Sequence, residues 1–245
     1  MVTTVTIAII GFLAGMLGTG LGGLSSYLIR NPSKRFFSII LGLSGGLMMA
    51  IVCFDLLPQA FMMVGLPLGI FGILFGVLTI SAIDEIIIRL EKKREKSRGV
   101  FVRTGILIGV GILIHNFPEG LAIGSGYMAT TKLGMSLAIV IAIHNIPEGI
   151  AMATPLSIGG MGRARVLLYT ILTGLPMGFG ALIGAMLGEI SPLFIGWCLG
   201  FAGGAMLFIT CQEIIPQSRN MWKGRISGFG IILGIIFGIL LSSLV

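Results

Sequence analysis

The sequence predicts an all-α membrane protein whose chain crosses the bilayer eight times. Hydrophobic residues make up 56% of its 245 residues and charged residues only 10%, whereas about 25% of the residues of a soluble domain are charged. The mean hydropathy is +1.08. A hydrocarbon core about 30 Å thick requires about 20 apolar residues in each spanning helix. We expect one transmembrane domain, 1–245, with eight helices over about residues 3–29, 36–59, 65–88, 104–127, 133–156, 165–188, 193–217 and 226–245.

The basic residues predict how these helices are oriented. Fifteen of the sixteen lysines and arginines lie in connections after the first, third, fifth and seventh helices, and only Lys132 lies on the opposite side. Cytoplasmic loops of membrane proteins are enriched in lysine and arginine. We therefore expect a multi-pass protein of the cytoplasmic membrane with both termini outside and a basic cytoplasmic loop at 89–103. The net charge of +7 then reflects membrane topology, and no nucleic-acid partner is expected.

An internal repeat relates the first and last thirds of the chain. The segment GGLMMAIVCFDLLPQ (45–59) aligns without a gap with GGAMLFITCQEIIPQ (203–217), with seven of fifteen positions identical and Asp55 opposite Glu213. The predicted topology sends these two helices in opposite directions, so the repeat is inverted. Transporters built from inverted repeats bind their substrates near the middle of the bilayer. We expect a 3+2+3 arrangement, with the fourth and fifth helices between two three-helix units.

The two central helices contain related octapeptides, HNFPEGLA (115–122) and HNIPEGIA (144–151), which hold the only two histidines of the chain. A histidine and a glutamate four residues apart lie on the same face of a helix. Pro118 and Pro147 cannot donate a backbone hydrogen bond, so each helix should kink there and expose a carbonyl. The glycine after each glutamate should let a second helix approach closely. The candidate metal ligands are His115, Asn116, Glu119, His144, Asn145 and Glu148.

Buried negative charge indicates what these residues bind. The carboxylates that fall within predicted spans include Asp55, Glu119, Glu148 and Glu213, and no lysine or arginine lies at comparable depth. A charged side chain at the centre of a bilayer costs about 2.5–3.5 kcal/mol, and a divalent cation would neutralise it. Imidazole with carboxylate suits zinc and other first-row metals, and amide oxygens suit harder ions. Mixed, weaker ligands favour an ion that must leave again. Acidification should weaken binding, because neutral imidazole is the ligating form.

Other interpretations stay open at this stage. The polar residues could be hydrogen-bonded contacts between helices, or a proton relay, although a relay does not explain the asparagine beside each histidine. An intramembrane metalloprotease would need H-E-x-x-H, which does not occur, so we expect neither an enzyme nor a catalytic cofactor. The protein could also be an ion- or proton-coupled carrier of another solute, or a receptor that binds metal without flux.

The motif doublet, with three helices on each side, resembles the ZIP family of divalent-metal transporters, and in particular bacterial members with this motif in both central helices. The resemblance covers essentially the whole chain. It implies transport of zinc, and also of iron, manganese or cadmium, toward the cytosol by an alternating-access homodimer. It further implies a binuclear site. The first metal position would take His115, Glu119, His144 and Glu148, and the second Asn116, Asn145 and a shared Glu148.

Four further residues are candidates for the transport path. The resemblance implies that Met48 lines the site, as a methionine does in some relatives. Met177, in TGLPMGFGAL (173–182), stands where relatives tend to carry a glutamate of the second metal position. That position should then be weakened, altered in preference or absent, unless Met177 simply packs in the core. Asp55 and Glu213 lie late in helices of opposite direction, so we expect them nearer the outside and the inside, respectively.

Overall fold

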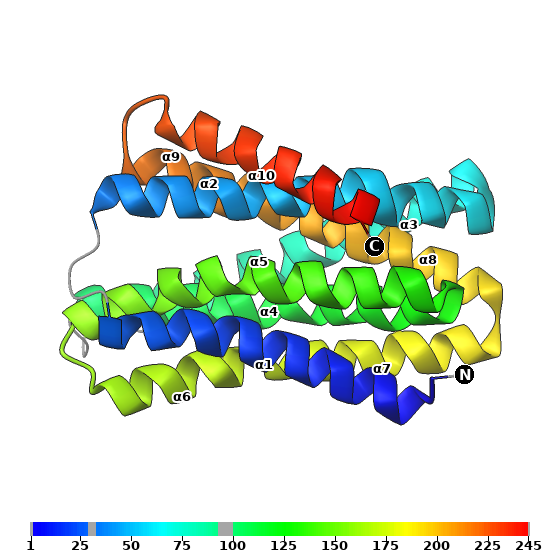
Figure 1. Ribbon diagram of the computed structural model, residues 1–245, viewed down its shortest axis with the longest axis horizontal. Coiled ribbons are helices and arrows are strands. Elements are labelled where there is room, and N and C mark those ends of the chain that lie inside the picture. The colour runs from blue at the N-terminus through cyan, green and yellow to red at the C-terminus, as the bar shows by residue number, and fades with distance from the viewer. Residues whose placement is uncertain (1, 29–32, 93–99, 245) are drawn as a thin grey trace.

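The computed structural model describes residues 2–28, 33–92 and 100–244, and within these ranges the chain is helical and contains no strand. The all-α class is thereby confirmed (Figure 1). The elements in order are α1 (Thr4–Leu28), α2 (Lys34–Ala50), the π-helical turn η1 (Ile51–Leu56), α3 (Leu57–Lys92), α4 (Val100–Ala129), α5 (Thr131–Ile158), α6 (Arg163–Thr173), α7 (Leu175–Ile190), α8 (Pro192–Ile209), the π-helical turn η2 (Thr210–Ile214), α9 (Ile215–Met221) and α10 (Ile226–Leu244).

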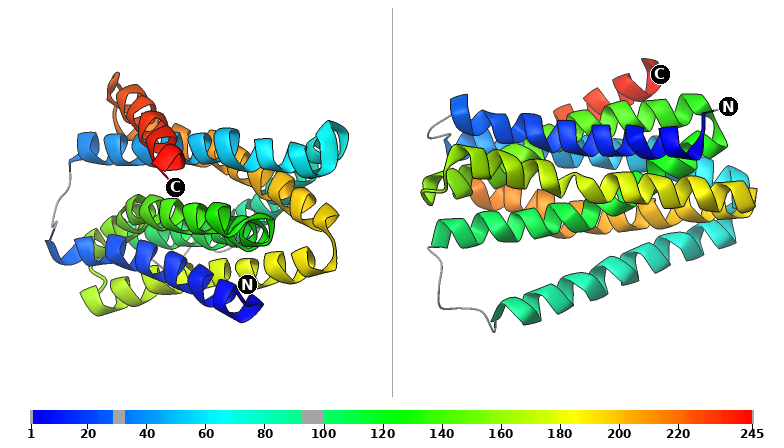
Figure 2. Two further views of the ribbon diagram at one scale, coloured as in Figure 1. Left: turned by 45° about the vertical axis from the view of Figure 1, so that its right-hand side comes forward. Right: turned by 90° about the horizontal axis from the view of Figure 1, so that it is seen from below.

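Six helical stretches of the described chain are long and apolar enough to cross a membrane, and a shorter apolar helix, Ile226–Ser242, follows them. The stretches are Thr4–Leu24, Lys34–Ile83, Phe101–Ala129, Thr131–Ile158, Arg163–Ile190 and Pro192–Met221. The second contains 50 residues, more than one crossing needs. At Gly65 its backbone has φ 74° and ψ 166°, a conformation that favours glycine. The chain turns back on itself there (Figure 2).

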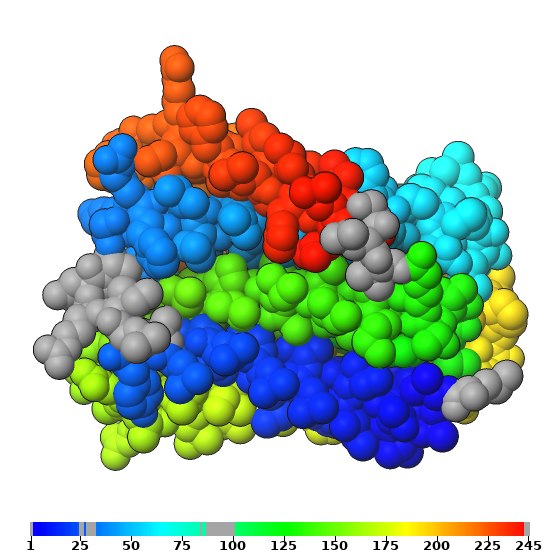
Figure 3. All heavy atoms as spheres, in the orientation of Figure 1, coloured from blue at the N-terminus to red at the C-terminus, as the bar shows by residue number. Residues whose placement is uncertain are grey.

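The helices lie in layers, with α4 and α5 in the middle (Figures 1 and 2). On one side α5 packs against α1, and α4 packs against α7. On the other side α2 packs against α10 and α9 and reaches α5, while α8 joins α3 to α4. In the space-filling view, side chains of α5 fill the space between α1 and α2 on the face shown (Figure 3). The motif-bearing helices therefore lie at the centre of the bundle, and α5 also reaches the surface on the face shown in Figure 3.

The outer face of α1 illustrates how the surface suits a bilayer. Val5, Ile9, Leu13, Leu17 and Leu21 recur every four residues and are 51% to 66% exposed. Residues at this spacing lie along one face of a helix. Water would not favour an apolar stripe of this length, whereas lipid chains would solvate it. The pattern supports a multi-pass membrane protein.

The motif glycines lie where helices meet most closely. A Cβ atom at Gly120 would overlap the carbonyl oxygen of Met177 in α7, and one at Gly149 would overlap the carbonyl oxygen of Thr19 in α1. The predicted close approach is confirmed at both positions. The helices α4 and α5 also remain helical through Pro118 and Pro147, so the prolines do not break them.

The two repeat segments share an unusual local structure. The π-helical turns η1 and η2 lie in corresponding parts of 45–59 and 203–217. Each precedes a proline, Pro58 or Pro216. A proline donates no backbone hydrogen bond, and a π-helical turn is one way for a helix to absorb that loss. The sequence identity of these segments is therefore accompanied by the same helical irregularity.

The described basic residues gather at one end of the molecule. The helices α2, α4, α6 and α10 all begin at that end (Figure 1), whereas Lys132 is the second residue of α5, which begins at the other end. The predicted loop 89–103 is shorter than expected, because α3 extends to Lys92 and α4 begins at Val100; its centre, 93–99, lies outside the described residues. The basic residues that lie near this end are Lys34, Arg35, Arg103, Arg163, Arg165, Arg219, Lys223 and Arg225.

Candidate metal centre

The six predicted ligands come from the middle of α4 and α5 and are all buried. His115 is 4% exposed, Glu148 is 3% exposed, and the other four are fully buried. Because the two helices lie side by side, the motif of one faces the motif of the other. Buried polar and ionisable groups are costly unless they are paired or bind a metal. Their contacts therefore decide what the site can do.

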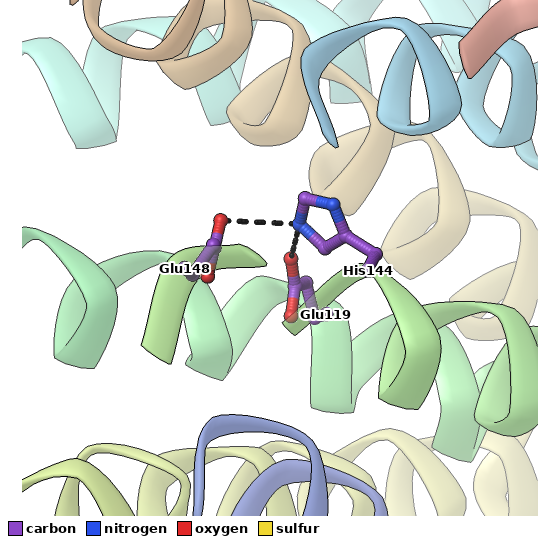
Figure 4. A group of neighbouring side chains, drawn as sticks. All are labelled: Glu119, His144 and Glu148. Atoms are coloured by element: carbon purple, nitrogen blue, oxygen red, sulfur yellow. Dashed lines mark ion pairs between the residues drawn. The ribbon is translucent and has the colours of Figure 1, made fainter. Parts of the chain in front are cut away.

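Three of these residues converge on one point (Figure 4). Nε2 of His144 lies 3.1 Å from Oε1 of Glu148 and 3.3 Å from Oε1 of Glu119. One ligand atom from each residue lies within 4.8 Å of the others. His144 and Glu148 lie four residues apart on one face of α5, as the spacing predicts, and Glu119 approaches from α4. We refer to Glu119, His144 and Glu148 as the triad.

His115 joins the triad through the second oxygen of Glu148. Its Nε2 lies 3.2 Å from Oε2 of Glu148, while Oε1 of the same carboxylate faces His144. Glu148 therefore lies between the two histidines and offers one oxygen to each. A carboxylate in this position can bind one ion with either oxygen or bridge two ions.

Several atoms of the triad make no hydrogen bond with the described residues, and the contacts of three of them are the ion pairs within the triad itself. They are both carboxylate oxygens of Glu119, Oε1 of Glu148 and Nε2 of His144. A buried polar atom left without a partner costs about 1–3 kcal/mol, and more when it is charged. These atoms lie close enough together for one cation to contact all three side chains. The donor set, imidazole nitrogen with carboxylate oxygens, is one that zinc accepts.

The structure does not bring the two asparagines into the triad. Asn116 donates through Nδ2 to the carbonyl oxygen of Thr173 at 2.6 Å, which leaves its Oδ1 without a partner. Thr173 is the last residue of α6, and the predicted helix 165–188 is interrupted at Gly174 before α7 begins. The interruption leaves the Thr173 carbonyl available to Asn116. Neither side-chain polar atom of Asn145 has a hydrogen-bond partner among the described residues.

Met48 and Met177 are fully buried and belong to the apolar core. The sulfur of Met48 accepts a hydrogen bond of 2.6 Å from the hydroxyl of Thr210 in η2. Met177 packs on the side of α7 that faces α4 and α1. The sequence left open whether Met177 binds metal or packs in the core, and its surroundings favour packing.

A serine that the sequence analysis did not identify also reaches the triad. The hydroxyl of Ser44 in α2 lies 2.9 Å from Nδ1 of His144. Ser44 is fully buried. The one signal in the sequence is a hydroxyl in the apolar, glycine-rich run LGLSGGLMM, and small polar residues are common in membrane helices.

A cavity of about 390 Å³ reaches His115 and Glu148. Its other polar lining residues are Gln212 and Glu213 in η2 and Gln217 and Asn220 in α9. Since α9 ends near the basic end of the molecule (Figure 1), the cavity extends from the triad toward that end. Asp55 lies elsewhere and accepts a hydrogen bond of 2.5 Å from Ser242 in α10.

Known proteins with similar sequences are consistent with this chemistry. A family model described as "ZIP Zinc transporter" matches residues 89–243. The chain is 33% identical to the zinc transporter ZupT of Stenotrophomonas maltophilia (strain R551-3), over 98% of this chain and 96% of that protein. It is also 33% identical to the ZupT of Chlorobium limicola, over 91% of each chain. Identity to the ZupT of Streptococcus mutans is 30%, over 94% of each chain.

Proposed function

Since the chain belongs to the ZIP family of zinc transporters, we propose that it carries zinc across the cytoplasmic membrane to the cytosol through the triad on α4 and α5. It is a transporter and not an enzyme. The observation that carries the proposed site is the convergence of two carboxylates and an imidazole, all buried, whose facing atoms contact one another and no other polar group among the described residues. Iron, manganese and cadmium are further candidate substrates, because similar ligands bind them.

The spacing of the triad atoms fits a zinc ion. Zinc binds imidazole nitrogen and carboxylate oxygen at about 2.0–2.2 Å in tetrahedral geometry, which places neighbouring ligand atoms about 3.3–3.6 Å apart. The distances from His144 Nε2 to Glu148 and Glu119 are 3.1 and 3.3 Å. Only small side-chain movements are needed to place one ion between the three residues. His115 would supply the fourth ligand, since it already contacts Glu148.

We propose that the chain binds one metal at a time. The second position of the family resemblance would take Asn116, Asn145 and a shared Glu148, joined in relatives by a glutamate at the place of Met177. Met177 packs in the core, so this position lacks the carboxylate of its own that relatives carry. Asn116 is held by its amide nitrogen to the Thr173 carbonyl, and only its Oδ1 is left to face an ion. Among the described histidines, cysteines and carboxylates, the triad is the one group of three that lies close enough to hold an ion.

We retain the eight-helix topology as part of the proposal. Counting the two arms of Lys34–Ile83 separately, and α10 as a span, gives eight crossings. The shared π-helical turns support the inverted 3+2+3 repeat. The basic end would face the cytosol, with both termini outside. A homodimer is a further expectation from the family resemblance alone.

The cavity supports a direction for release. It connects His115 and Glu148 with the basic end, so this conformation would be open to the cytosol. Glu213 lines that cavity and would attract the departing cation. Asp55 lies outside the cavity and is half-buried beside Ser242, so it would act on the opposite side, where metal enters.

The test is uptake into sealed proteoliposomes of zinc, iron(II), manganese and cadmium by the parent protein and by Glu148→Ala. The proposal predicts zinc flux in the parent and its loss in the variant. The matched control is Glu189→Ala, which changes an exposed carboxylate bonded to Thr4 and should preserve flux. Binding of zinc by the parent without flux would favour a receptor, and uptake only with an organic solute would favour a coupled carrier.

A further inference from the structure

We propose that Ser44 is a positioning residue that holds the imidazole of His144 with Nε2 toward the metal. The inference rests on the proposed function and concerns the same site. Ser44 Oγ lies 2.9 Å from Nδ1 of His144. The opposite ring nitrogen, Nε2, faces the carboxylates of Glu119 and Glu148. The ring is thus held from both edges.

The chemistry of imidazole explains why the Nδ1 contact matters. A metal binds a ring nitrogen that carries no proton, so the other nitrogen of a neutral ligand carries the N–H. In the zinc-bound form, Nδ1–H of His144 donates to the hydroxyl oxygen of Ser44. Metal-binding histidines usually have such a partner, which fixes both the tautomer and the ring orientation.

The two histidines differ in this respect. Nδ1 of His115 is buried and has no hydrogen-bond partner among the described residues. His115 also lines the cavity that leads toward the basic end, whereas His144 is fully buried. His144 is therefore the fixed ligand and His115 the one that can rotate. The two copies of the motif therefore differ in role. The copy with His144 holds the ion in place, and the copy with His115 faces the cavity through which the ion leaves.

The packing of α2 fixes the position of Ser44. Gly42 and Gly46 are each two residues from Ser44, about 200° around the helix, so they lie on roughly the opposite face. A Cβ at Gly46 would overlap the carbonyl oxygen of Ile231 in α10, and one at Gly42 would lie 2.8 Å from that of Ser227. Close contact with α10 on that face holds Ser44 toward α5. The bond to His144 then exists only while α2 and α5 are adjacent.

The first experiment measures zinc binding to the purified full-length protein by equilibrium dialysis. Loss of a hydrogen-bond partner behind a metal-binding histidine typically lowers affinity about 10- to 100-fold, and we expect that loss for Ser44→Ala. Ser38→Ala is the matched control, because Ser38 is also a fully buried serine of α2 and its hydroxyl has no partner. The control should bind zinc as the parent does. Equal affinities in the two variants would overturn the proposal.

The second experiment separates positioning from a general loss of structure. The chain has two histidines, so ¹⁵N NMR of histidine-labelled protein in zinc resolves two rings, assigned with His115→Ala. In the parent, His144 should show a single tautomer with protonated Nδ1. Zinc on Nε2 keeps the proton on Nδ1, so Ser44→Ala should shift the Nδ1 resonance of His144 alone, as its N–H loses its acceptor. Ser44→Thr, which keeps the hydroxyl, should restore the position seen in the parent. An unchanged His144 spectrum in Ser44→Ala would refute the positioning role.

Failure of this inference is distinguishable from failure of the proposed function. If Glu148→Ala abolishes zinc flux but Ser44→Ala matches Ser38→Ala, only the role of Ser44 is wrong. If Glu148→Ala leaves flux intact, the triad is not the transport site and both proposals are wrong.

Discussion

Replacement of Glu148 by glutamine removes one negative charge from the centre of the site while keeping the shape of the side chain. In the structure one oxygen of Glu148 lies 3.1 Å from His144 and the other 3.2 Å from His115. These positions let each oxygen turn toward an ion bound between the residues. A contact with a charged group is worth about 1.5–3 kcal/mol, so losing two such contacts to the ion costs about 3–6 kcal/mol of binding free energy. At about 1.4 kcal/mol per tenfold change, zinc affinity should fall about 10²- to 10⁴-fold.

The assay for Glu148→Gln is competition for zinc against a chelating dye in detergent solution, with thermal unfolding measured in parallel. Without metal, the variant should unfold no earlier than the parent, because a neutral amide is cheaper to bury than a carboxylate. Glu189→Gln, an exposed change of the same kind, should leave affinity unchanged. A loss of less than about tenfold in Glu148→Gln with the fold intact would refute the assignment of Glu148 as a metal ligand.

Four further predictions follow from the same geometry. Metal analysis of the zinc-loaded protein should give one zinc per chain, and two would contradict the proposal that the chain binds a single ion. Acidification from about pH 7.5 to about pH 5.5 should weaken zinc binding, because protonated imidazole cannot ligate; constant affinity in dialysis would argue against histidine ligation. Asp55→Ala and Glu213→Ala should each slow uptake while tight binding persists, and equal loss of binding in both would contradict their placement along the path. Gly120→Ala should lower the unfolding temperature in detergent, because its Cβ would meet the Met177 carbonyl; an unchanged temperature would contradict the close packing of α4 on α7.

Patterns among neighbouring residues in the sequence were sufficient to predict much of the fold and part of the metal site. Helical runs follow from apolar length, and the side-by-side placement of His144 and Glu148 follows from spacing along one helix. The close approach of another helix to each motif glycine was predicted because a small residue in a membrane helix usually marks a contact, although the pattern did not say which helix. All of these properties depend on residues that are near neighbours in the sequence.

Other features depend on residues that are distant in the sequence. The bond between Ser44 and His144 joins positions 100 residues apart, and no local pattern specifies that pairing. The break at Gly174, which frees a carbonyl for Asn116, separates two short helices inside one apolar run. The π-helical turns are similarly invisible to hydropathy, although the repeated proline after each one was a clue that the alignment contained.

The central claim is that α4 and α5 hold the transported zinc with nitrogen and oxygen ligands. X-ray absorption at the zinc edge of the loaded, transport-competent protein tests it most directly. We predict nitrogen and oxygen neighbours at about 2.0–2.2 Å, with the scattering pattern of imidazole and no sulfur. Sulfur at about 2.3 Å would place zinc on cysteines such as Cys53 and Cys211, which are free and exposed, and would contradict the account.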